Sequence, residues 1–259
     1  MNYLGILTGI AICLGGIIGY LPQFYNIIKY DSVHGISEVT LVLANIGLMC
    51  LTMNSLIYSW SYFFNDFSNL LPFISIALSW FMILIYYIIF ITYKIQNKHK
   101  SLSSHTSSSG TSSSSDKTQK RLLYGLHYAI TYLIFTIFVL ALSLGEKIQG
   151  NMKFFIVFAD ILGYTSAILN SLVYLPQIYT LWKNKSSGNL SLLMYVIQTP
   201  GNVIIIVFQA FLYSAPISTW ITYVIVLLEQ SIILFLMIYY TYCAASNIAK
   251  TEEDLQLIA

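Results

Sequence analysis

Charged residues are scarce in this 259-residue chain: 8% are Asp, Glu, Lys or Arg, whereas 57% are hydrophobic. A water-soluble domain carries about a quarter charged residues. The composition therefore excludes a soluble fold and predicts an integral membrane protein. Cysteine is also rare, and Cys13, Cys50 and Cys243 all lie in apolar runs. They have neither metal-ligand spacing nor the even number of a disulfide framework, so we interpret them as small packing residues.

The motifs of catalysis are missing as well. The chain contains no glycine-rich phosphate loop, no closely spaced set of metal ligands and no Ser/His/Asp arrangement at a plausible site. These absences predict a protein that is not an enzyme, uses no cofactor or metal and does not bind nucleic acid.

Long apolar runs are what the chain has instead. A membrane helix needs about 20 apolar residues, and seven stretches qualify, which predicts an all-α integral membrane protein. The first stretch has no basic segment before it, so we expect a retained helix and not a cleaved signal peptide. The predicted spans are 3–28, 36–60, 70–93, 122–144, 154–182, 190–213 and 217–243.

The tetrapeptide Tyr-Leu-Pro-Gln occurs twice, at residues 20–23 and 174–177, which are 154 positions apart. Eight of the eighteen positions that begin at each tyrosine are identical. This self-similarity predicts two three-helix halves joined by a linker helix, a 3+1+3 arrangement. Because an odd number of spans separates the halves, we expect them to be parallel repeats. The predicted units are 1–93, 94–121, 122–144, 145–243 and 244–259.

A proline lies inside the apolar run of each repeat. Proline removes one helical hydrogen bond and clashes with the carbonyl four residues earlier. We therefore expect Pro22 and Pro176 to be paired hinges, a static kink being the alternative. Gln23 and Gln177 are expected to support the hinges by donating hydrogen bonds beside the freed carbonyls.

Two polar segments flank these spans. The segment 94–121 has a centre, 101–115, that is almost entirely Ser and Thr, so we expect it to be disordered. It would be a tether between the halves or a phosphorylatable regulatory loop. Ten of the 12 basic residues fall on one side of a seven-span chain. This bias predicts a luminal amino terminus, with the Ser-rich loop and the tail in the cytosol.

The repeated motif resembles the PQ-loop repeat family. In each copy, Pro-Gln precedes a lysine seven residues after the proline and a Ser…Gly…Ser turn that opens the next helix. The family includes cystinosin, lysosomal and vacuolar cationic amino-acid exporters and, more distantly, the SWEET sugar transporters. The resemblance implies export of a small polar solute, an amino acid, from an endolysosomal or vacuolar lumen to the cytosol, coupled to protons. A SWEET-like sugar uniporter and a solute-sensing receptor or scaffold remain as alternatives.

Two acidic residues at membrane depth, Asp160 and Glu229, have no basic residue at similar depth. Charges in hydrocarbon are costly, and such residues are functional candidates. We expect one of them to carry the coupling proton or to bind a cationic group, and the alternative is a plain interhelical hydrogen bond. In cystinosin a proton-linked Asp lies in the sixth helix, and the aligned residue here is Gln198.

Polar amides at membrane depth are the other substrate candidates. We expect Asn45, Gln198 and Asn202 to line a central cavity, because paired asparagines contact substrate in SWEET-like relatives. Interhelical hydrogen bonds are the alternative. The tyrosines and tryptophans are interpreted as interfacial belts.

The carboxyl tail ends in an acidic and leucine-rich pattern formed by Glu253, Leu257 and Ile258. It resembles the acidic dileucine signal that cytosolic sorting adaptors bind. We expect an unstructured tail in which this signal is accessible, the alternative being an amphipathic tail end. Substrate, protons, lipid and these adaptors are therefore the expected partners, and the oligomeric state is left open.

Overall fold

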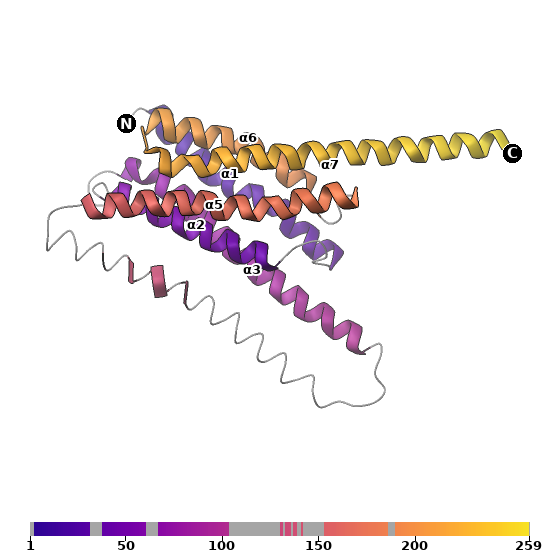
Figure 1. Ribbon diagram of the computed structural model, residues 1–259, viewed down its shortest axis with the longest axis horizontal. Helices are drawn as coiled ribbons and strands as arrows, with labels where there is room; N and C mark the ends of the chain where they lie inside the picture. The colour runs from indigo at the N-terminus through magenta and orange to yellow at the C-terminus, as the bar shows by residue number, and fades with distance from the viewer. Residues whose placement is uncertain are drawn as a thin grey trace.

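The computed structural model describes the backbone of residues 3–31, 38–60, 67–103, 153–185 and 190–258, with short pieces at 130–131, 133–135, 137–138 and 141. This part of the chain is helical throughout and contains no strand (Figure 1). Six of its helices are long and apolar enough to cross a membrane. The prediction of an all-α multi-pass membrane protein is therefore confirmed.

The helices follow the predicted spans closely at their starts. They are α1 (Tyr3–Tyr30), α2 (Glu38–Ser59), α3 (Leu71–Ser103), α5 (Lys153–Asn184), α6 (Leu192–Val207) and α7 (Ile217–Ile258). A short 3-10 helix, η2 (Phe67–Leu70), leads into α3, and a π-helical turn, η3 (Phe208–Leu212), follows α6.

Two predicted boundaries are wrong. The helix α3 runs ten residues into the segment expected to be a disordered loop, and α7 continues to Ile258 through the tail expected to be unstructured. Neither extension contains Gly or Pro, and the tail is rich in Ala, Glu and Leu, which favour helix. The rest of the Ser-rich segment, including most of 101–115, lies outside the described residues.

The predicted linker span 122–144 lies largely outside the described residues too. Its described pieces are helical and contact both halves of the molecule. The ring centroids of Phe135 and Trp80 of α3 lie 5.0 Å apart, and those of Phe138 and Phe158 of α5 lie 6.0 Å apart. These contacts are consistent with a helix that joins the two halves.

Both halves have the same internal order. In the first half α3 packs against both α1 and α2, and in the second half α7 packs against both α5 and α6. The halves meet through two matched contacts, α2 with α5 and α1 with α6. This pattern of contacts is expected when a pseudo-two-fold axis along the bundle relates the two halves.

The four odd-numbered helices begin at one end of the bundle, here called the amino-terminal face. At this face Tyr58, near the end of α2, contacts Asp160 near the start of α5. At the opposite, carboxyl-terminal face, Lys94 near the end of α3 forms an ion pair with Glu38 at the start of α2. The halves therefore run parallel, as the repeat predicts.

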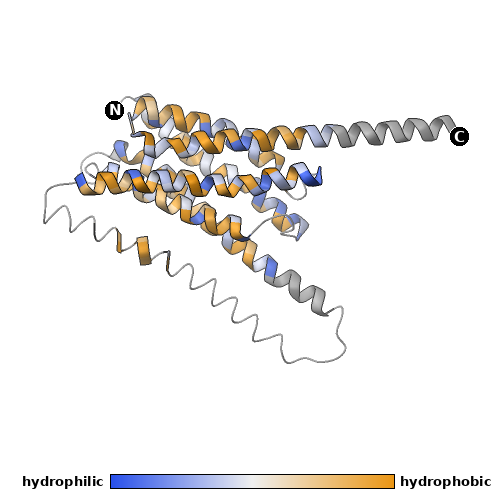
Figure 2. Cartoon of the chain, viewed as in Figure 1, coloured by the Kyte–Doolittle hydropathy of each residue, from blue (hydrophilic) through white to orange (hydrophobic). Residues whose placement is uncertain are grey.

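The outer surface of the bundle is apolar, as a lipid-facing surface must be (Figure 2). The same positions face outward in both repeats, 154 residues apart. Tyr25 and Tyr179, for example, are 61% and 57% exposed, and each carries a lysine ammonium over its ring. The further exposed pairs are Leu14 with Ile168, Ile18 with Leu172, and Leu21 with Leu175.

Candidate functional site

A cavity of about 320 Å³ lies at the centre of the bundle, and all six described long helices contribute to its wall. Its size lies at the lower end of the range of small-molecule sites, roughly 300–1,000 Å³. None of the described residues that line it is Asp, Glu, Lys or Arg. The cavity is therefore uncharged and sized for a small solute.

The wall is built from equivalent positions of the two repeats. A shift of 154 residues, the distance between the two prolines, superposes lining residues of the first half on lining residues of the second. Both repeats thus turn the same helix faces inward. The matched pairs are Gly16 with Asn170, Tyr20 with Tyr174, Ala44 with Gln198, Leu48 with Asn202, and Leu51 with Ile205.

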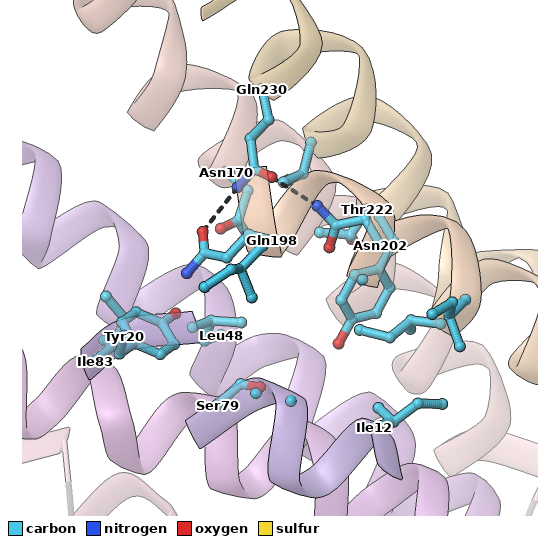
Figure 3. Close-up of a pocket in the computed structure, with 18 of the residues that line it drawn as sticks. Ile12, Tyr20, Leu48, Ser79, Ile83, Asn170, Gln198, Asn202, Thr222 and Gln230 are labelled. Atoms are coloured by element: carbon cyan, nitrogen blue, oxygen red, sulfur yellow. Dashed lines mark hydrogen bonds between the residues drawn. The ribbon is translucent and has the colours of Figure 1, made fainter. Parts of the chain in front are cut away.

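A hydrogen-bond network covers one side of the cavity, with Gln230 of α7 at its centre (Figure 3). Its Oε1 accepts a hydrogen bond from Asn202 Nδ2 at 2.8 Å. Its Nε2 donates to the Tyr174 hydroxyl at 3.0 Å and to Gln198 Oε1 at 3.3 Å. Thr222 also lines the cavity, and its hydroxyl is buried without a partner among the described residues. This side can therefore bind an uncharged polar group.

Of the three amides expected in the cavity, Gln198 and Asn202 line it and Asn45 does not. Asn45 is fully buried and turned toward α3, where its Oδ1 accepts a hydrogen bond from Trp80 Nε1 at 3.2 Å. The repeat equivalent of Asn202 is Leu48, so the expected pairing of Asn45 with Asn202 is not found. In this state Asn45 joins two helices of the first half.

Neither acidic candidate lines the cavity. Asp160 lies toward the amino-terminal face, where its Oδ1 accepts hydrogen bonds from Tyr58 at 2.8 Å and from Ser218 at 2.6 Å. Glu229 of α7 is 7% exposed, and its Oε1 accepts a hydrogen bond from Ser171 of α5 at 2.8 Å. Its second oxygen, Oε2, is buried without a partner among the described residues. Both acids thus connect helices around the cavity.

The two prolines lie within continuous helices, α1 and α5, on the carboxyl-terminal side of the cavity. Gln23 does not act as the expected donor beside its hinge. Its Oε1 instead accepts a hydrogen bond from the backbone N–H of Ser191 at 3.2 Å, and Ser191 is the N-cap of α6 in the other repeat. Its Nε2 is buried beside Tyr86 without a well-formed hydrogen bond.

Gln177, the second copy, likewise bonds to α6 and not to its own helix. Its Oε1 accepts a hydrogen bond from the Tyr195 hydroxyl at 2.7 Å. Both glutamines of the repeated motif therefore hold the start of α6, one from each half of the molecule. This arrangement fixes the start of α6 against α1 and α5.

Sequence reasoning missed four cavity residues. Tyr20 and Tyr174 were assigned to interfacial belts, although their identity in both copies of the tetrapeptide was the available signal. Asn170 and Gln230 were not predicted to line the cavity. Gln230 follows Glu229 directly, and consecutive residues of an α-helix point about 100° apart. The amide therefore faces the cavity while the acid faces α5.

The tail residues Glu253, Leu257 and Ile258 belong to the last turns of α7. Their side chains lie outside the described residues, so the dileucine pattern remains a prediction. A helical backbone here replaces the extended tail in which the signal was expected.

The fold and the site together define a multi-pass membrane protein of transporter type, in which two parallel three-helix repeats enclose a central cavity. The PQ loop repeat model matches residues 4–64 and 158–219, one region in each half. The chain belongs to the PQ-loop repeat family. It is also similar to an uncharacterized protein of Schizosaccharomyces pombe, with 25% identity over 264 residues that cover 95% of this chain and 83% of the relative.

Replacing Gln23 with leucine is expected to lower stability by about 1–3 kcal/mol, because the buried N–H of Ser191 loses its acceptor. The measurement is the thermal unfolding midpoint of the purified protein in detergent. Thr180→Ala is the control, since the exposed Thr180 hydroxyl bonds only to its own helix and its loss should leave the midpoint unchanged. Equal midpoints in the two variants would show that the Gln23–Ser191 hydrogen bond does not hold α6.

Proposed function

We propose that this protein transports a small polar solute without net charge from an endolysosomal or vacuolar lumen to the cytosol, and that the solute is a neutral amino acid. The cavity carries this proposal, because it lies between two parallel repeats, is sized for a small solute and is lined by amides and tyrosines. A solute with net charge would lose its hydration and find no opposite charge on the described wall.

Contacts between helices near both faces support alternating access as the mechanism. At the amino-terminal face the side chains of Ile12, Leu71 and Phe208 form a buried apolar cluster that joins α1, α3 and η3. At the carboxyl-terminal face Gln23 and Gln177 hold α6. In our proposal Pro22 and Pro176 flex on this second side, where each breaks one helical hydrogen bond, and release α6 when the cavity opens to the cytosol.

The proposed direction depends on the distribution of basic residues. Lys29, Lys94 and Lys183 lie at the carboxyl-terminal face, and the positive-inside rule assigns that face to the cytosol. The amino-terminal face, with Asp160, is then luminal. The tail would also be cytosolic, where sorting adaptors could bind the pattern that ends at Ile258.

We further propose that Glu229 carries the coupling proton. One of its oxygens is buried and unpaired, and the next residue, Gln230, is the centre of the cavity network. Gain or loss of a proton at Glu229 would therefore act on the helix that presents the network to the solute. Asp160 is the second candidate for this role.

Flux into proteoliposomes with an imposed pH gradient tests transport and coupling together. We expect neutral amino acid flux that the gradient accelerates in the wild type. In Glu229→Gln this acceleration should disappear while exchange of the same solute at equal pH continues. Asp160→Asn is the comparison variant. Unchanged acceleration in both variants would refute proton coupling, and absence of flux for every neutral solute would refute transport.

A sugar is the second candidate solute. The specific observation in its favour is that both acids lie outside the cavity, where each accepts a hydrogen bond from a hydroxyl group, so that the binding site itself is neutral. Amides and aromatic rings are the usual partners of a sugar's hydroxyl groups and ring faces. Including hexoses in the flux assay, with and without a pH gradient, separates this candidate from the first.

A further inference from the structure

The polarity of the cavity is one-sided. The second repeat contributes Asn170, Tyr174, Gln198, Asn202, Thr222 and Gln230, which form one wall. The first repeat contributes mainly glycine, alanine and aliphatic side chains. Figure 3 shows Asn170, Gln198, Asn202, Thr222 and Gln230 on one side of the cavity and Ile12, Leu48 and Ile83, together with Tyr20 and Ser79, on the other.

Two polar side chains on the first-repeat side do not change this pattern. The Ser79 hydroxyl donates to the backbone oxygen of Ser75 at 3.0 Å, so its proton is used within its own helix. The Tyr20 ring stacks on Phe24, with centroids 6.3 Å apart, and its hydroxyl is the one polar group of this wall that no described side chain engages. Apart from the Tyr20 hydroxyl, the described part of the first-repeat wall therefore presents little free hydrogen-bonding capacity.

The asymmetry arises at equivalent positions of the two repeats. Where the first repeat has Gly16, Ala44 and Leu48, the second has Asn170, Gln198 and Asn202. The backbone places these pairs alike, so the choice of side chain alone makes the walls differ. A solute that was polar on all sides would lose hydration against the first wall without gaining hydrogen bonds there.

We infer that the transported solute is amphipathic. Its polar end, which has no net charge, binds the amides of the second-repeat wall. Its apolar part lies against the first-repeat wall and determines specificity through Gly16, Ala44 and Leu48. This inference rests on the proposed transport function, and among neutral amino acids it selects those with aliphatic side chains.

Two glycines leave room for the apolar part. A Cβ atom built on Gly15 meets nothing within 4 Å, and one built on Gly16 meets only Ser79 Oγ at 3.5 Å. The wall could therefore accept a methyl group at either position without rearrangement, so some space at these glycines is available to a solute. Packing alone does not require glycine at either position.

Pairs of solutes that are similar in size and differ in polarity test the inference in proteoliposomes. The probes are radiolabelled leucine and asparagine, valine and threonine, and galactose and its 6-deoxy form, D-fucose. We expect the more apolar member of each transported pair to enter at least about tenfold faster at low concentration, because a hydroxyl against an apolar wall loses its hydration. Leu48→Asn, which installs the second repeat's own residue, should reduce this ratio to near one. Leu48→Met is the matched control and should keep the ratio.

The outcomes separate this inference from the proposed function. Equal rates for both members of a transported pair in the wild type would overturn the inference and leave transport standing. A ratio that Leu48→Asn and Leu48→Met change equally would also overturn it, because volume and not polarity would then decide. No flux for any of the six probes would count against the transport function itself. Unfolding midpoints of both variants establish that each protein is folded.

Discussion

Substituting alanine for Gly163 is expected to prevent assembly of the bundle. A Cβ atom at this position would lie 2.2 Å from the backbone oxygen of Ser218 and 2.9 Å from Asn54 Nδ2. Overpacking costs about 1–3 kcal/mol when side chains can move, and here a backbone is in the way. The helices α5 and α7 must separate, so we expect a loss of at least about 3 kcal/mol.

The measurement is the yield of monodisperse protein and its unfolding midpoint in detergent. Gly201→Ala is the matched control, because its Cβ atom meets nothing within 4 Å and alanine favours helix by about 1 kcal/mol over glycine. The two substitutions should thus shift stability in opposite directions. Equal midpoints in the two variants would mean that α5 and α7 do not approach each other as closely as described.

Substituting leucine for Gln230 is expected to reduce transport at least about 100-fold. The substituted cavity can no longer form its hydrogen bonds to the polar group of the solute, so it should bind that group much more weakly. The side chain of Gln230 bonds to Asn202, Tyr174 and Gln198. Its removal leaves three buried groups without this partner, at a cost of about 1–3 kcal/mol each. Initial flux of the best solute in proteoliposomes, normalised to inserted protein, is the measurement.

Ser231→Ala is the control on the neighbouring position. The exposed Ser231 hydroxyl bonds to the Leu227 carbonyl of its own helix, so flux should stay at the wild-type level. Restoration of flux by Gln230→Glu would indicate that an acceptor oxygen suffices. Wild-type flux in Gln230→Leu would show that the network does not contact the solute.

Much of this architecture is readable from the chain because membrane helices are long, apolar and self-contained. The hydrocarbon requires every backbone group to bond within its helix, so apolar length predicts each span. The repeated tetrapeptide predicts the two halves, and the 154-residue shift proves to hold for lipid-facing and cavity-facing positions alike. Errors occur at the carboxyl-terminal ends of α3 and α7, where a polar sequence was interpreted as disordered although it contains no helix breaker.

The candidate site was harder to predict. A polar side chain at membrane depth can face the cavity or a neighbouring helix, and the sequence does not distinguish the two. Asn45 and Asn202 look equivalent along the chain, yet one bonds to Trp80 and the other lines the cavity. Glu229 is the conspicuous residue, yet its neighbour Gln230 carries the network. The side chains of Glu229 and Gln230 point about 100° apart around the same helix. A membrane helix is apolar on every side, so its sequence does not indicate which side faces the cavity.

The amino-acid sequence by itself thus determined the membrane class, the helical spans of the described part and the two parallel repeats, because these depend on local apolar length and on internal similarity. Tertiary structure decided which side chains meet. It turned Gln23 toward Ser191 of the other repeat, directed both acids away from the cavity and placed Asn170, Gln198 and Asn202 opposite Gly16, Ala44 and Leu48. The physical reason is that helix rotation and pairing are determined by packing between distant segments, where close approaches such as that at Gly163 permit only one arrangement.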